Sequence, residues 1–96
     1  MSFSWDPAKD AENVRKHGVS FEKAVKIFDG LVVDEIDHRD DYGEVRVISL
    51  GLLDGTVVLT VVHTDRDGVT RLISARKATL TERGRYEEAV RQSING

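Results

Sequence analysis

Three runs of β-branched and other apolar residues dominate the middle of the chain, and short turn sequences separate them. Asp54-Gly55 stands between the first two runs, and Asp67-Gly68 stands between the last two. Asp-Gly adopts the positive φ angles that a tight hairpin turn requires. The pattern therefore predicts an antiparallel meander of three strands. The expected strands are residues 44–51, 56–63 and 69–76.

A helix with few apolar residues is expected near the N-terminus. Asp6 can cap it, Pro7 suits the first helical position, and Gly18 is a common residue just after a helix end. These signals place the helix at residues 7–17, after a short extended lead-in that contains Phe3. The polar face of this helix is expected to be solvated. It carries Lys9, Asn13, Lys16 and His17.

A second helix and a first strand are expected before the meander, and a third helix after it. Residues 20–29 carry apolar side chains at positions i, i+3, i+4 and i+7, and residues 31–36 form an apolar run typical of a strand. Thr79 and Glu82 have the spacing of a capping box, which predicts a helix through residues 81–93. The predicted fold class is α+β, with two N-terminal helices, a four-stranded, mainly antiparallel sheet and a C-terminal helix.

Composition narrows the class of protein. The chain has 96 residues, of which 40% are hydrophobic and 32% charged, so one folded domain over residues 1–96 is expected rather than a disordered chain. The absence of cysteine excludes disulfides, thiolate metal sites and cysteine nucleophiles. No apolar run approaches the roughly 20 residues of a membrane span, and the N-terminus lacks a signal-peptide core. We expect a cytoplasmic protein without a membrane partner.

Charge is unevenly distributed along the chain. The formal net charge is −3, which by itself argues against a protein that binds nucleic acid. Most of the negative charge lies in one central segment, whereas both ends of the chain are mildly basic. This acidic segment contains Asp29, Asp34, Glu35, Asp37, Asp40 and Asp41.

Charged residues inside the predicted strands are candidates for chemistry. Strand alternation sends Glu44 and Arg46 to one face, and Ser74 and Arg76 to one face of the last strand. If these two faces coincide, arginines could hold a phosphate while a carboxylate moves a proton. Alternation places Arg71 on the opposite face. The alternative interpretation is a cross-strand salt bridge on a solvated surface.

Histidines and acidic residues offer further candidates. His17 ends the first helix, where it is either a helix-stabilising cation or a proton donor and acceptor. His63 ends the second strand of the meander and is expected at the surface. The spacing in the acidic segment matches neither a calcium loop nor a helical His pair, so we expect no metal there. The acidic segment's candidate ligands are Asp34, Asp37, His38, Asp40 and Asp41.

Several stretches together resemble the BrnT family of type II toxins. They are FSWDPAKDAENVRKHGVSFEKAVKIF near the start, GEVR before the meander, and RLISARKATLTERGRY towards the end. The resemblance covers nearly the whole chain in the same order. It implies a RelE-like fold, a ribonuclease that blocks translation, and a BrnA-like antitoxin partner. It further implies a possible homodimer or a heterotetramer with that antitoxin.

The resemblance also implies which residues act. They lie in the KHG, GEVR and RLISAR stretches, with Tyr86 as a further candidate. The expected reaction is metal-independent and needs no cofactor: a ribose 2′-OH attacks the neighbouring phosphate. The catalytic candidates are His17, Glu44, Arg46 and Arg76. The candidates for RNA backbone contacts are Lys9, Lys16, Arg66, Arg71 and Lys77. The alternative is a non-catalytic module that docks a protein on the charged sheet face.

Overall fold

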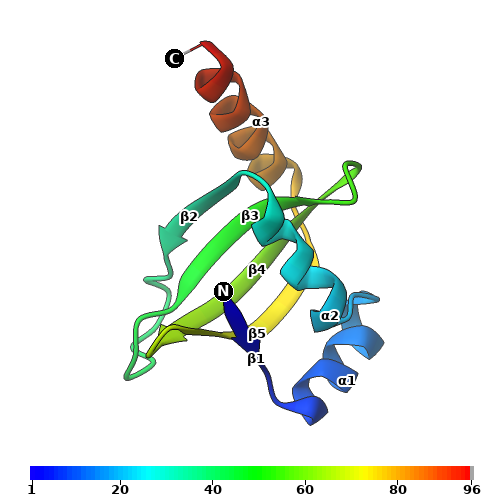
Figure 1. Ribbon diagram of the computed structural model, residues 1–96, viewed down its shortest axis with the longest axis vertical. Coiled ribbons are helices and arrows are strands. Elements are labelled where there is room, and N and C mark those ends of the chain that lie inside the picture. The colour runs from blue at the N-terminus through cyan, green and yellow to red at the C-terminus, as the bar shows by residue number, and fades with distance from the viewer. Residues whose placement is uncertain (96) are drawn as a thin grey trace.

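A five-stranded sheet with three α-helices and one 3-10 helix makes up the computed structural model, which describes residues 1–95 (Figure 1). Among these residues, no helix is long and apolar enough to cross a membrane. The elements in chain order are β1 (Ser2–Ser4), α1 (Pro7–His17), α2 (Phe21–Ala24), η1 (Val25–Asp29, 3-10), β2 (Val32–Ile36), β3 (Val47–Leu53), β4 (Val57–Arg66), β5 (Val69–Lys77) and α3 (Leu80–Asn95).

The sheet has the order β1-β5-β4-β3-β2, in which β1 is parallel to β5 and the other neighbours are antiparallel. The α+β class is confirmed, but the expected four-stranded sheet is wrong by one strand. Ser2–Ser4 was expected as an extended lead-in, and it pairs with the free edge of β5 instead. Three residues are too few for a period-two pattern to reveal a strand.

Both predicted hairpin turns are present. Asp54 and Gly55 have φ angles of 51° and 72°, and Asp67 and Gly68 have φ angles of 52° and 80°. Positive φ at both central residues gives the turn a twist that matches the twist of its strands. The two Asp-Gly pairs therefore join β3 to β4 and β4 to β5 as predicted.

The first strand of the meander starts later than expected. β3 begins at Val47, so Glu44 and Arg46 lie in the connection that precedes it. Two hydrogen bonds hold this connection in place: Asp37 N donates to Arg46 O at 2.8 Å, and Thr64 Oγ1 donates to Val45 O at 2.9 Å. Glu44 and Arg46 are therefore positioned beside the sheet by these contacts, and not by strand alternation.

A β-bulge interrupts β5. Val62 pairs with Ser74 while His63 pairs with Leu72, which leaves Ile73 as the extra residue. Leu72 and Ala75 are both buried, and Ile73 and Ser74 lie between them on the other face. The bulge reverses the alternation within the strand.

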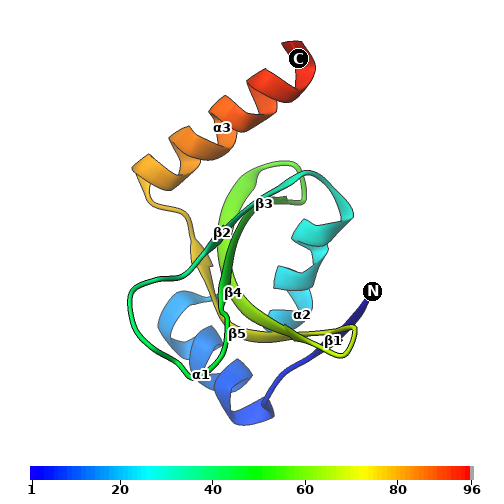
Figure 2. The same ribbon diagram turned by 90° about the vertical axis from the view of Figure 1, so that its left-hand side faces the viewer.

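The larger hydrophobic core lies under α2 and η1. Phe21, Ile27 and Val61 are almost completely buried there. The helical stripe predicted for residues 20–29 is confirmed, although its second half is a 3-10 helix. Gly51 allows this close packing, since an added Cβ would lie 2.7 Å from Cβ of Ile27. Figure 2 shows α2 on one side of the sheet.

The C-terminal helix begins with the predicted capping box. Glu82 N donates to Thr79 Oγ1 at 3.2 Å, and Thr79 N donates to Glu82 Oε1 at 2.8 Å. Tyr86 anchors the helix on a smaller core cluster, where it packs with Leu50 and Val58. In Figure 2, α3 starts on the side of the sheet opposite α2 and then runs away from it.

One buried side chain fixes α1 against β5. Asn13 is 6% exposed, so its expected place on a solvated face is wrong. Its Nδ2 donates to Ala75 O at 2.8 Å and to Val19 O at 2.7 Å, and its Oδ1 accepts from Ala75 N at 3.1 Å. These three bonds engage both the donor and the acceptor of the Asn13 amide. They hold α1 along the edge of β5, with its C-terminal turn beside the sheet.

Candidate functional site

Five of the predicted site residues line one hollow of about 410 Å³ at the end of the sheet where β4 and β5 meet. The bulge in β5 turns Arg71 towards this hollow, so the prediction that it lies on the face opposite Arg76 is wrong. We call this the cationic hollow. Its charged lining residues are Lys9, Glu44, Arg46, Arg66, Asp67 and Arg71.

Positive charge exceeds negative charge in the cationic hollow. Four basic side chains face two carboxylates, and the Glu44 to Arg66 contact is long at 3.9 Å. Within residues 1–95, Lys9, Arg46 and Arg71 form no ion pair. Unpaired guanidinium groups keep their full capacity to bind a phosphate. The cationic hollow therefore carries a net positive charge, with Glu44 and Asp67 as its two carboxylates.

Arg46 is held in place by an aromatic ring. Its Cζ lies 3.9 Å from the ring centroid of Tyr42, which is a cation–π contact. The Tyr42 hydroxyl donates to Asp37 Oδ2 at 3.2 Å, so the ring is tied to a buried carboxylate. Nε of Arg46 is buried and has no hydrogen-bond partner among the described residues. Sequence reasoning did not find Tyr42, because only the folded loop brings it under Arg46.

His17 and Lys16 line a smaller neighbouring hollow of about 200 Å³ between α1 and β5. This α1 hollow shares Lys9 and Ile73 with the cationic hollow. The Asn13 amide explains the placement, because it fixes the last turn of α1 beside the bulge. His17 is exposed, and it lines the α1 hollow rather than the cationic hollow.

Arg76 lies in a third hollow, of about 540 Å³, which we call the Arg76 hollow. Its Nη1 and Nη2 donate to the two carboxylate oxygens of Glu82 at 2.7 and 3.0 Å. Glu82 also accepts from Thr60 Oγ1 at 3.0 Å. These bonds, led by the one from Arg76, lower the pKa of Glu82 to about 2. The structure therefore separates Arg76 from the residues of the cationic hollow and neutralises it.

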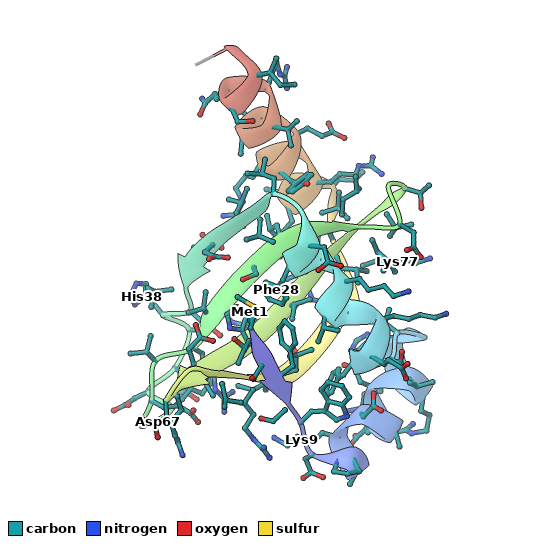
Figure 3. The ribbon with its side chains drawn as sticks, in the orientation of Figure 1. Met1, Lys9, Phe28, His38, Asp67 and Lys77 are labelled. Carbon is teal, nitrogen blue, oxygen red and sulfur yellow. The ribbon has the colours of Figure 1, made fainter. Side chains whose placement is uncertain are left out.

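Two further candidates lie elsewhere. Lys77 lines a hollow with Val58 and Arg83, and Figure 3 shows it far from Lys9 and Asp67. Tyr86 is 7% exposed, and its hydroxyl donates to Leu31 O at 3.2 Å. Tyr86 thus serves the packing of α3.

The acidic segment uses its carboxylates for internal contacts. Asp37 accepts from Nε and Nη2 of Arg39 at 2.8 and 2.7 Å, which holds the pKa of Asp37 well below its usual range. Asp34 accepts from the Ser49 hydroxyl at 2.5 Å. In the part of the chain that the structure describes, no group of three or more His, Cys, Asp or Glu side chains could hold a metal ion.

A serine, a histidine and an aspartate form a chain on the helix-covered face of the sheet. His63 Nε2 lies 2.7 Å from Ser49 Oγ, and its Nδ1 lies 3.0 Å from Asp65 Oδ1. His63 is 4% exposed, so its expected surface position is wrong, and it packs edge-on against Phe28. Ser49 is completely buried, with its proton donated to Asp34. No substrate can reach this serine, and the chain of polar groups is structural.

Comparisons with known proteins show the family of this chain and its shared fold. A sequence model described as "Ribonuclease toxin, BrnT, of type II toxin-antitoxin system" matches residues 5–82. The structure is similar to the crystal structure of the Brucella abortus ribonuclease toxin, BrnT, with a TM-score of 0.64 and 22% sequence identity. That match covers 82% of this chain and 97% of the Brucella chain, and at this identity it shows the shared fold. A comparison with curated proteins finds no match.

The family match begins just after β1 and ends in the first turn of α3. It contains Glu44, Arg46 and Arg71 of the cationic hollow and His17 of the α1 hollow. A cation-rich hollow with a carboxylate and a histidine beside it suits the cleavage of RNA. The chain belongs to the BrnT family of ribonuclease toxins of type II toxin-antitoxin systems.

Proposed function

We propose that residues 1–96 form one toxin domain that cleaves RNA internally, without a metal ion or other cofactor, in the cytoplasm. The observation that carries this proposal is the group of four basic side chains around Glu44 in the cationic hollow. The RelE-like relationship expected from the resemblance is part of the proposal. So are a BrnA-like antitoxin that neutralises the activity, and an assembly that is a homodimer or a heterotetramer with that antitoxin.

The reaction is a transfer of the phosphoryl group within the RNA. The 2′-oxygen of one ribose forms a bond to phosphorus, and the bond from phosphorus to the 5′-oxygen of the next nucleotide breaks. Glu44 takes the proton from the 2′-hydroxyl, and His17 gives a proton to the departing 5′-oxygen. The products are a 2′,3′-cyclic phosphate and a 5′-hydroxyl.

The arginines supply the charge that a metal ion would supply in other nucleases. Arg46 and Arg71 are free of carboxylate partners within the described residues, so both can bind the crowded, doubly negative phosphorane. Lys9, Lys16 and Arg66 lie around them and bind neighbouring phosphates. Arg76 and Lys77 lie farther along the protein and contribute weaker contacts, since Glu82 already neutralises Arg76.

Growth of cells that lack the antitoxin tests this function. Induced expression of the wild-type protein should stop growth, and Arg46→Ala should remove the effect. Arg46→Lys should restore part of it, since lysine keeps the charge but loses the planar fork. The matched control is Arg91→Ala, an exposed arginine on α3 that pairs with Glu88.

Circular dichroism of each variant shows whether it has folded. If folded Arg46→Ala stops growth as strongly as the wild type, the cationic hollow is not the active site. If the wild-type protein is harmless and cuts no RNA, the protein-docking alternative replaces the ribonuclease.

A further inference from the structure

The Arg76 hollow is larger than the cationic hollow and has a different chemical character. It lies on the same face of the sheet, and its volume of about 540 Å³ is within the range of small-molecule sites. Neither the proposed reaction nor the packing of the core uses it. It is lined by Glu35, Ile36, Asp37, His38, Arg39, Ile48, Thr60, Val62, Ser74, Arg76 and Glu82.

Both arginines that line the Arg76 hollow are already bound to carboxylates through two hydrogen bonds. Arg76 binds Glu82 at 2.7 and 3.0 Å, and Arg39 binds Asp37 at 2.8 and 2.7 Å. Glu35 is paired in the same way with Arg85, at 2.9 Å for both bonds. A phosphate would have to displace one of these carboxylates. The hollow is therefore poorly suited to a phosphate and well suited to an uncharged group with polar edges.

The floor of the Arg76 hollow is a row of side chains across three neighbouring strands. Ile48 of β3 pairs with Val62 of β4, and Val62 pairs with Ser74 of β5. Neighbouring strands are about 4.8 Å apart, so this row is about 10 Å wide. Apolar side chains with fixed hydrogen-bonding groups at their rim match the flat face and the polar edge of a nucleobase.

The bulge in β5 connects the Arg76 hollow to the proposed active site. Arg71 and Ile73 line the cationic hollow, Ile73 and Ser74 line the α1 hollow, and Ser74 and Arg76 line the Arg76 hollow. The three hollows therefore follow one strand from Val69 to Arg76, a length of about 23 Å at about 3.3 Å per residue. A single strand of RNA a few nucleotides long could follow this path.

We propose that the Arg76 hollow binds a nucleobase of the RNA substrate, close along the strand to the scissile phosphate. This inference rests on the proposed function. It assigns different parts of the RNA to the two ends of the sheet face. Phosphates bind at the end where the arginines are unpaired, and a base binds at the end where the arginines are paired. The sequence preference of the ribonuclease then arises in the Arg76 hollow.

Short single-stranded RNAs test the proposal through binding, so the outcome does not depend on cleavage. Each RNA carries 2′-O-methyl groups, which remove the nucleophile, and one base at a time is deleted. Fluorescence anisotropy measures the affinity of the wild type, Ile48→Ala and Leu52→Ala. Leu52 is the matched control, because it lies on the same strand and face as Ile48 but lines a hollow beside α3.

We expect one base deletion to weaken binding to the wild type by about 10-fold, since contact with one base changes affinity by roughly 5- to 150-fold. Ile48→Ala should bind the intact RNA more weakly and lose most of this sensitivity, and Leu52→Ala should behave as the wild type. Ile36→Ala, at the exposed rim of the hollow, replaces Ile48→Ala if that variant does not fold.

Salt dependence separates a base contact from a phosphate contact. Ile48→Ala should leave the slope of log Kd against log salt unchanged, whereas Arg71→Ala should reduce its magnitude by about 0.7 for a single strand. A scan in which no base deletion matters, or one in which Ile48→Ala keeps the full sensitivity, overturns the proposal. So does a result in which Ile48→Ala weakens binding of the purified antitoxin but leaves RNA binding unchanged.

Cleavage of the unmodified RNAs separates this proposal from the proposed function. If the wild type binds with a base-deletion effect that Ile48→Ala removes but cuts no RNA, the base site stands and the ribonuclease assignment fails. If the wild type cuts RNA and no base deletion changes binding, the ribonuclease stands and the base site fails.

Discussion

Replacing Glu82 with glutamine should weaken the fold in a way that depends on pH. Glu82 accepts two hydrogen bonds from Arg76 and one from Thr60, and it caps the backbone N–H of Thr79. Its side chain is 15% exposed, so water replaces these bonds poorly. Glutamine removes the charge, leaves Arg76 without its partner and keeps the size of the side chain.

The size of the expected destabilisation follows from the pKa of Glu82. The contacts lower the pKa of Glu82 from 4.5 to about 2, and each tenfold change in acidity corresponds to about 1.4 kcal/mol. The upper limit is therefore about 3 kcal/mol, and exposure of the Arg76 side chain reduces it. Because the folded-state pKa is depressed, this stabilisation is complete above pH 4.5 and is lost as the pH falls towards 2.

Urea unfolding at a series of pH values measures the effect. The difference in the free energy of unfolding between wild type and Glu82→Gln should be about 2 kcal/mol at pH 7 and should shrink between pH 4.5 and 2. Glu87→Gln is the matched control on the same helix, because its contact with Arg83 is 3.9 Å long and exposed. A difference that is constant with pH, or equal for the two variants, refutes the reasoning.

Two further variants test the packing of the sheet. Gly51→Ala should lower the free energy of unfolding by about 1–3 kcal/mol, because the new Cβ would lie 2.7 Å from Cβ of Ile27. Gly30→Ala, where a Cβ meets no atom within 4 Å, should stay near wild type, and equal urea midpoints for the two would contradict the close packing. Ser49→Ala should cost at least about 1 kcal/mol by leaving Nε2 of His63 unpaired in a buried place, yet the folded variant should cut RNA at the wild-type rate. Loss of cleavage in folded Ser49→Ala would give this serine a role in the reaction.

Local signals in the sequence predicted much of the fold. The start and end of α1, both Asp-Gly turns and the capping box of α3 each depend on residues only a few positions apart, so the sequence displays them directly. The short β1 was missed because its three residues carry no periodic pattern and its pairing with β5 spans most of the chain.

The candidate site was predicted in part. Glu44, Arg46 and Arg71 do come together, but for reasons that alternation could not supply. A single extra residue, Ile73, turns Arg71 to the correct face, and nothing in its apolar neighbours distinguishes a bulge from a regular strand. The bonds from Asn13 to Ala75 join residues 62 positions apart, and such a contact has no sequence signature.

The central claim is that the cationic hollow cleaves RNA without a metal ion. The most direct measurement is single-turnover cleavage of RNA in the presence of EDTA, with the chemical ends of the products identified. The account predicts that the wild type leaves 2′,3′-cyclic phosphate and 5′-hydroxyl ends, that Arg46→Ala is slower by about 10²–10³-fold, and that Arg91→Ala is unchanged. Cleavage that requires added magnesium, or folded Arg46→Ala that cuts at the wild-type rate, would contradict it.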